Sequence, residues 1–206
     1  MSQDRFAPRT DADVDRLIAE HPLAWVVSGL GAEIRATPLP IRPRFDTDGR
    51  LTHLVGHFAR SNPQVEGLRH DPRALILFLG PQGYISPSWM GDRTQAPTWN
   101  YASAQFLVEV ELMSDPDELQ ALLQDLIDTV EARRPDAWRL EEMGERFARL
   151  SRMIVGFQAH ILDTRAKFKL GQDERDDVFA DILAGLEATG GVNLREWMRE
   201  FEVRKA

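Results

Sequence analysis

Alternating apolar residues restrict this chain to a fold built mainly on β-strands. Between Trp99 and Met113 apolar side chains occupy every second position from the middle onward: Ala104, Phe106, Val108, Val110 and Leu112. Successive side chains of a strand point to opposite faces, so this spacing turns one apolar face toward a core. The segment from Met153 to Leu162 repeats the pattern. Two long alternating segments of this kind predict a sheet or barrel with one buried face.

Four shorter segments in the first half are also typical of strands, and turn-forming residues separate them. They cover residues 22–27, 34–42, 51–58 and 73–79. The connection Ser28-Gly29-Leu30-Gly31 is typical of a hairpin, and Asp46-Thr47-Asp48-Gly49 is typical of a tight turn. The density of turn formers from Gly80 to Thr98 predicts a loop. Six strands in total favour a barrel.

Helical spacing of apolar residues marks five further segments. They cover residues 11–20, 63–69, 116–132, 176–188 and 194–203. Asn62 is a suitable N-cap for the second helix and Asp115 for the third. The pattern predicts a mainly β fold with helices (α+β). Residues 1–173 form the barrel domain, with the helix 115–132 inserted, and residues 174–206 form a helical C-terminal extension.

Charge and composition exclude several classes of protein. The chain has 25 Lys and Arg against 33 Asp and Glu, a net charge of −8, which disfavours binding along a DNA backbone. The absence of cysteine excludes disulfides and thiolate metal sites. No apolar run approaches the roughly 20 residues that span a membrane, and the charged N-terminus does not resemble a secretion signal. We therefore expect a cytoplasmic protein that does not enter membranes.

The first candidate site lies where the strand 51–58 meets the next helix. Arg60 and Ser61 follow the strand, and Asn62 and Pro63 begin the helix. Free N–H groups at a helix start, the helix dipole and a guanidinium together suit a phosphate. A simple helix cap beside a solvated arginine explains the same residues. His57 precedes them, and on a strand it lies ~13 Å from His53, too far to share a metal, so we predict no metal site.

A second candidate site combines aromatic and small polar residues. Its members are Tyr84, Ser86, Ser88, Trp89, Trp99, Asn100 and Tyr101. Such side chains can sandwich a planar ring and bind its polar edge, but an ordered loop held by its own aromatics has the same composition. Lys167 and Lys169 face one side of a strand end, where they either neutralise a phosphate or extend into solvent.

Eight short segments, taken in order, resemble the PaiB family. They are FAPR, DRLIAEHPLAWVVS, ATPLPI, LTHLVGHFARSNPQ, LFLGPQGYISPSW, PTWNY, MIVGFQAHI and KFKLGQD, between about Phe6 and Asp173. The resemblance implies a six-stranded FMN-binding split β-barrel and a homodimer. Related pyridoxamine-oxidase-like barrels bind FMN between two subunits. Four apolar residues of the tail favour a dimer as well: Leu194, Trp197, Met198 and Phe201.

The resemblance also assigns residues to the cofactor. It implies that His57, Arg60, Ser61 and Asn62 lie near the flavin phosphate. The YISPSW and TWNY residues then lie near the ring and the ribityl chain. Four more residues match family positions and complete the predicted cofactor-binding set: Thr37, Lys167, Lys169 and Gln172.

Three functions remain open at this point. The family is described as negative transcriptional regulators, which admits DNA as a partner although the net charge does not support it. A flavin-dependent oxidoreductase of the pyridoxamine-oxidase-like group fits the same barrel. The third possibility is a degenerate barrel that binds no flavin, because the chain departs from the family pattern at several positions. Pro38 replaces a histidine, and Gly171 and Asp173 replace a serine and an asparagine.

Overall fold

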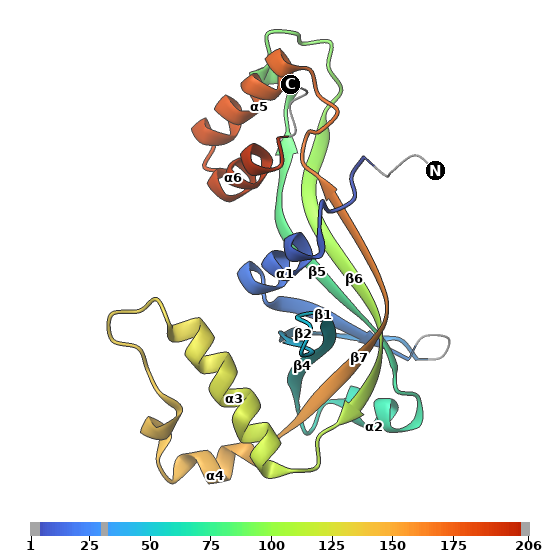
Figure 1. Ribbon diagram of the computed structural model, residues 1–206, viewed down its shortest axis with the longest axis vertical. Helices are drawn as coiled ribbons and strands as arrows, with labels where there is room; N and C mark the ends of the chain where they lie inside the picture. The colour runs from blue at the N-terminus through green and yellow to red at the C-terminus, as the bar shows by residue number, and fades with distance from the viewer. Residues whose placement is uncertain (1–4, 30–32, 203–206) are drawn as a thin grey trace. The chain divides into compact units, whose positions relative to one another are not determined.

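The computed structural model describes residues 5–29 and 33–202 (Figure 1). Within them, seven strands form one sheet in the order β2-β1-β5-β6-β7-β4-β3. The strands are β1 Leu23–Ser28, β2 Arg35–Pro40, β3 Arg42–Phe45, β4 Leu51–Ala59, β5 Arg73–Ile85, β6 Thr98–Leu112 and β7 Ile154–Lys169. The α-helices are α1 Asp11–Glu20, α2 Pro63–His70, α3 Pro116–Glu131, α4 Arg146–Ser151, α5 Asp176–Ala188 and α6 Val192–Glu200, with 3-10 turns η1 Pro87–Trp89 and η2 Leu140–Met143. The mixed α+β class is confirmed.

The chain divides into two compact units. Unit 1 comprises Met1–Leu17, Leu79–Ala104 and Arg165–Ala206, and unit 2 comprises Ile18–Phe78 and Gln105–Thr164. The predicted boundary after residue 173 falls inside unit 1, and the predicted inserted helix, α3, lies in unit 2. The two candidate sites are divided in the same way: the phosphate candidates belong to unit 2 and the aromatic candidates to unit 1.

Unit 2 is built around the β1–β2 hairpin and the long strand β4. The hairpin pairs Leu23 with Pro40 and continues to Ser28 and Arg35, as predicted, while Leu30 and Gly31 of its connection lie outside the described residues. Strand β4 pairs with β3 on one side and β7 on the other. One face of β4 contributes Phe58 to the main core, and the other packs Val55 against α3. This packing fixes the end of β4, where the first candidate site begins.

Unit 1 buries the apolar tail. Helices α5 and α6 lie side by side (Figure 1), and Trp197 stacks on Phe201 at 5.8 Å between ring centroids. The Arg9 guanidinium lies 3.8 Å from the Phe201 ring centroid, a cation–π contact. Trp197 and Phe201 are at most 2% exposed, and Leu194 and Met198 are equally buried. The tail residues expected at a dimer surface therefore form the core of unit 1.

The structure differs from the sequence prediction in three elements. The single strand expected at 34–42 is two strands, because Ile41 turns into the core and β2 and β3 pair with different neighbours, β1 and β4. The loop expected from Gly80 begins only after Ile85, because β5 continues to that residue. Helix α4 was not predicted. In the described part of the chain, no helix is long and apolar enough to cross a membrane.

Candidate functional site

The turn between β4 and α2 is shaped by Asn62, the N-cap of the helix. Its side-chain oxygen accepts a hydrogen bond from the Gln64 N–H at 2.9 Å, and its side-chain nitrogen donates to the Thr37 hydroxyl at 2.9 Å. Pro63 occupies the first helical position. The predicted cap is confirmed, and Thr37 is brought to it from β2. Asn62 and Thr37 are therefore engaged with the protein itself.

Ser61 is the residue of this turn whose donors remain available. Its neighbours are bound, because the Arg60 N–H donates to the Met153 carbonyl at 2.8 Å and the Asn62 N–H donates to the Ala59 carbonyl at 2.9 Å. Ser61 is exposed, and its N–H and hydroxyl make no hydrogen bond to the described residues. A serine at the positive end of a helix can donate hydrogen bonds from both of these groups to phosphate oxygens.

The Arg60 side chain is held in one orientation by the first residue of β7 and by Arg152, the C-cap of α4. Nε donates to the Arg152 carbonyl at 2.9 Å and Nη2 donates to the Ile154 carbonyl at 2.8 Å. A guanidinium has five N–H groups, so three of them bond to no described residue and can serve a ligand. Arg60 also lines a cavity of about 490 Å³ with residues of α3 and α4. The arginine is thus a preoriented cation.

His57 is a half-buried residue of β4 with an unsatisfied ring nitrogen. Its Nδ1 is buried and has no hydrogen-bond partner among the described residues. Burial lowers the pKa of His57 below its ordinary value of 6.5, so the ring is neutral at pH 7. A neutral imidazole adds a hydrogen bond to a ligand but no positive charge.

The aromatic candidates in unit 1 form a smaller group than the sequence predicted. Tyr84 and Trp99 are 45% and 53% exposed and meet edge to face, with ring centroids 6.3 Å apart. Tyr101, two residues along β6 from Trp99, is half-buried and points to the same face. These three side chains form an aromatic surface that a planar ring can contact.

The other polar and aromatic candidates of unit 1 have structural partners. Asn100 points to the opposite face of β6, where it is 1% exposed and donates to the Met198 sulfur at 3.6 Å. The Trp89 ring packs against Gly185 of α5 so closely that an added Cβ would lie 2.3 Å from the ring. The hydroxyls of Ser86 and Ser88 bond to each other at 2.7 Å. Each of these four side chains is therefore engaged with another residue of unit 1.

The lysine-rich stretch at the end of β7 also makes contacts within unit 1. Lys169 donates to the Thr98 hydroxyl, and the Lys167 ammonium lies 5.5 Å from the Phe6 ring centroid. The Gln172 side chain closes its own turn, accepting from the Leu170 N–H at 2.7 Å.

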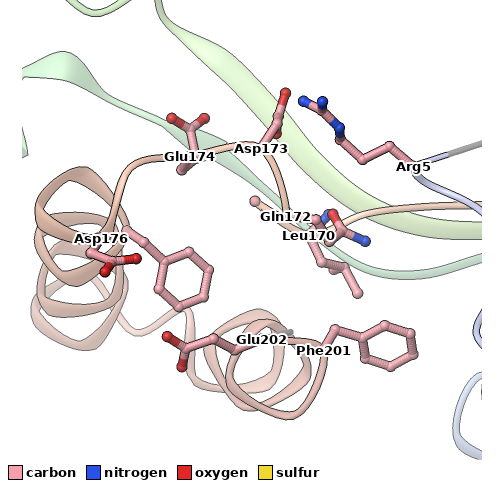
Figure 2. Close-up of a pocket in the computed structure, with 10 residues that line it drawn as sticks. Arg5, Leu170, Gln172, Asp173, Glu174, Asp176, Phe201 and Glu202 are labelled. Atoms are coloured by element: carbon pink, nitrogen blue, oxygen red, sulfur yellow. The ribbon is translucent and has the colours of Figure 1, made fainter. Parts of the chain in front are cut away.

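Gln172 also lines a cavity of about 460 Å³. Figure 2 shows the charged residues around this cavity, which are Arg5, Asp173, Glu174, Asp176 and Glu202. Four carboxylates against one guanidinium repel a phosphate. We therefore expect phosphate to bind at the β4–α2 turn and not in this acidic cavity.

Gln64 is a residue of the site region that the sequence did not single out. It is 1% exposed, and its side-chain nitrogen donates to Val26 and Ser28 of β1 and to Arg35, the first residue of β2. The sequence signal for this residue is the motif SNPQ, in which the polar Gln64 directly follows the N-cap Asn62 and Pro63. Its burial depended on β1 and β2, which lie far from it in the sequence.

The sheet, the phosphate-suited turn and the exposed aromatic surface fit a flavin-binding protein of the split-barrel class. Residues 2–163 match the family described as "Putative FMN-binding domain", and the chain belongs to that family. Its cofactor is FMN.

Individual proteins are similar to this chain in sequence or in fold. "Protease synthase and sporulation protein PAI 2" of Bacillus subtilis is 25% identical over 92% of this chain and 90% of its own length. The flavocytochrome Anf3 of Azotobacter vinelandii has the same fold, with a TM-score of 0.61, 18% identity, and 79% and 69% of the two chains covered. The FAD and heme binding protein of Mycobacterium smegmatis gives a TM-score of 0.56 at 20% identity, with 86% and 79% covered. The likeness to PAI 2 confirms the resemblance to the PaiB family.

Proposed function

We propose that the chain holds FMN by its phosphate at the β4–α2 turn. The observation that carries the proposal is the pair of Ser61 donors that bond to no described residue, beside a helix start whose other donors are bound within the protein. Arg60 supplies the positive charge and His57 a neutral ring nitrogen. Hydrogen bonds to ionised groups are each worth roughly 1.5–3 kcal/mol, enough for the phosphate to dominate the affinity. The bound flavin supplies redox chemistry, and these residues bind and orient it.

For unit 1 taken by itself, we propose that the aromatic surface of Tyr84, Trp99 and Tyr101 is a contact for a flat isoalloxazine ring. Its support is the exposure of two large rings that bury little of their surface in unit 1. Contact between tryptophan and a flavin quenches flavin fluorescence. Trp99→Ala is therefore expected to leave bound FMN brighter than in the unchanged protein. Equal brightness in the two proteins would remove this surface from the site.

We propose a homodimer, and its interface is placed on the outer face of the β1–β2–β5 region of unit 2. On this face Trp25 is 50% exposed and Leu23 is 63% exposed. Trp25 pairs with Pro38 on one side and Leu77 on the other, so apolar side chains cover three adjacent strands. A second copy of the same face is the partner that matches it in chemistry. Trp25→Glu should yield monomers in light scattering at micromolar concentration, and a persisting dimer would move the interface elsewhere.

The biological role that we propose is regulatory, with FMN occupancy of the dimer as the signal. The support is the resemblance to the PaiB family. Among the side chains proposed for FMN, His57 alone is of a type that titrates near neutral pH, which gives little acid–base machinery for an enzyme. The net charge of −8 places any DNA contact on a small local patch.

The visible spectrum of the freshly purified protein, followed by addition of NADH, tests this proposal. Absorbance bands of oxidised flavin that NADH does not bleach are expected. FMN-dependent binding to DNA from upstream of its own gene, measured by fluorescence anisotropy, would support regulation. Rapid bleaching with multiple turnovers would instead assign the chain to the flavin-dependent oxidoreductases. A colourless protein that does not bind added FMN would indicate the degenerate barrel.

A further inference from the structure

The side chain of Gln64 is a buried polar group in unit 2 with a full set of partners. Its nitrogen donates to the Val26 carbonyl at 3.1 Å, the Ser28 hydroxyl at 2.9 Å and the Arg35 carbonyl at 3.2 Å. An amide nitrogen has two protons, so three acceptors share them. These bonds tie the first turn of α2 to both strands of the β1–β2 hairpin.

The oxygen of the same side chain begins a closed ring of hydrogen bonds. The Thr37 hydroxyl donates its single proton to Gln64 Oε1, so the Thr37 oxygen is left to accept from Asn62 Nδ2. This bond turns the Asn62 oxygen toward the Gln64 N–H, which donates to it at 2.9 Å. The ring therefore runs from the Gln64 side chain through Thr37 and Asn62 back to the Gln64 backbone.

The ring fixes which end of each amide faces the helix. If the Gln64 oxygen were absent, the Thr37 proton would be free to rotate, and the Asn62 amide would lose the constraint that holds its oxygen over the helix start. Ser61 is bonded covalently to Asn62, so the position of its free donors follows the orientation of the cap. A buried amide that loses its partners is also destabilising, because no hydrogen bond then offsets the loss of its contacts with water.

We propose that Gln64 is a positioning residue for the phosphate end of FMN. It acts through Thr37 and Asn62 and places Ser61 without touching the ligand. This inference rests on the proposed phosphate site. It adds that the preference for FMN over a flavin without phosphate depends on the buried side-chain amide of Gln64, the second residue of α2.

The test compares FMN with riboflavin, which lacks the phosphate, in fluorescence titrations of purified variants. Gln64→Met keeps the volume of the side chain and removes its hydrogen bonds. Thr37→Val breaks the ring and leaves the three bonds of the Gln64 nitrogen intact, so it serves if Gln64→Met fails to fold. Both variants are expected to weaken FMN binding at least tenfold and riboflavin binding less than threefold.

Leu68→Ala is the matched control. Leu68 lies in the same helix and is 2% exposed, but its side chain is apolar and takes no part in the ring. This variant should lower the melting temperature while keeping the ratio of FMN to riboflavin affinity. A general loss of stability would therefore not imitate the expected result.

Two results would overturn the inference in different ways. If the unchanged protein prefers FMN and the Gln64→Met or Thr37→Val variant keeps that preference, Gln64 does not position the site, and the proposed function stands. If the unchanged protein binds FMN and riboflavin equally, the phosphate site fails and the inference fails with it.

Discussion

Replacing Ser61 with aspartate should weaken FMN binding without weakening the fold. Ser61 is exposed and its side chain makes no hydrogen bond to the described residues, so the change removes no internal contact. The new carboxylate lies just before the N-cap of α2, at the positive end of the helix. Acidic groups there stabilise a helix by about 0.3–1 kcal/mol. The free energy of unfolding should therefore stay constant or rise slightly.

The carboxylate of Ser61→Asp replaces a donor by a negative charge at the proposed phosphate position. Two unit charges about 4 Å apart repel by about 1 kcal/mol in water and about 4 kcal/mol near a protein surface. A phosphate monoester carries about −1.5 to −2 charge at pH 7. Water and the nearby Arg60 reduce the repulsion, so we expect a loss of about 2–4 kcal/mol. At about 1.4 kcal/mol per tenfold change, this is roughly 30-fold to 1000-fold in Kd.

The assay is a flavin fluorescence titration of Ser61→Asp with FMN and with riboflavin. Ser61→Asn is the control, because asparagine has the size of aspartate without its charge. Riboflavin affinity should change less than twofold in both variants. Raising the salt concentration should narrow the gap between aspartate and asparagine, because ions screen exposed charges. Equal FMN affinity of the two variants, or equal losses for FMN and riboflavin, would refute the reasoning.

Two further predictions concern stability. Gly185→Ala should lower the free energy of unfolding by about 1–3 kcal/mol, because the added Cβ would lie 2.3–2.6 Å from ring atoms of Trp89. Gly67→Ala, at a helix position where an added Cβ has no atom within 4 Å, should raise the free energy of unfolding by about 0.5–1 kcal/mol. Thermal melts in which both substitutions shift the melting temperature in the same direction would contradict the packing argument. Burial lowers the pKa of His57 in the folded chain, so below about pH 6.5 this histidine binds a proton more readily in the unfolded chain. The free energy of unfolding should therefore fall as the pH drops below about 6.5. In urea titrations at pH 7.5 and 5.5, His57→Gln should show a smaller loss than the unchanged protein, with a remainder from His53, whose pKa burial also lowers; an undiminished loss would exclude His57 as the source.

Much of the fold could be predicted from local patterns. Alternation located the strands, and caps located α2 and α3, because these signals depend on residues next to each other in the chain. The extension of β5 to Ile85 was missed because Gly80 and Gly83 are turn formers by composition. In the structure Gly83 serves close packing instead, since an added Cβ would lie 3.0 Å from Leu194.

The candidate site could be predicted in part for the same reason. The phosphate-suited turn is a run of consecutive residues, so the sequence displays it directly. The aromatic group is not consecutive, and strand alternation divides it: Trp99 faces outward while its neighbour Asn100 is buried under α6. Gln64 was overlooked because its burial depends on residues of the β1–β2 hairpin. The apolar tail was misjudged because its covering partners, such as Phe168, belong to the distant strand β7.

A paired titration of the unchanged protein with FMN and riboflavin tests the central claim most directly. The isoalloxazine ring is identical in the two ligands, so their difference in Kd isolates the phosphate. We predict that FMN binds at least tenfold more tightly than riboflavin and that the difference shrinks as salt is added. Equal affinities at low salt would contradict a phosphate site at the β4–α2 turn.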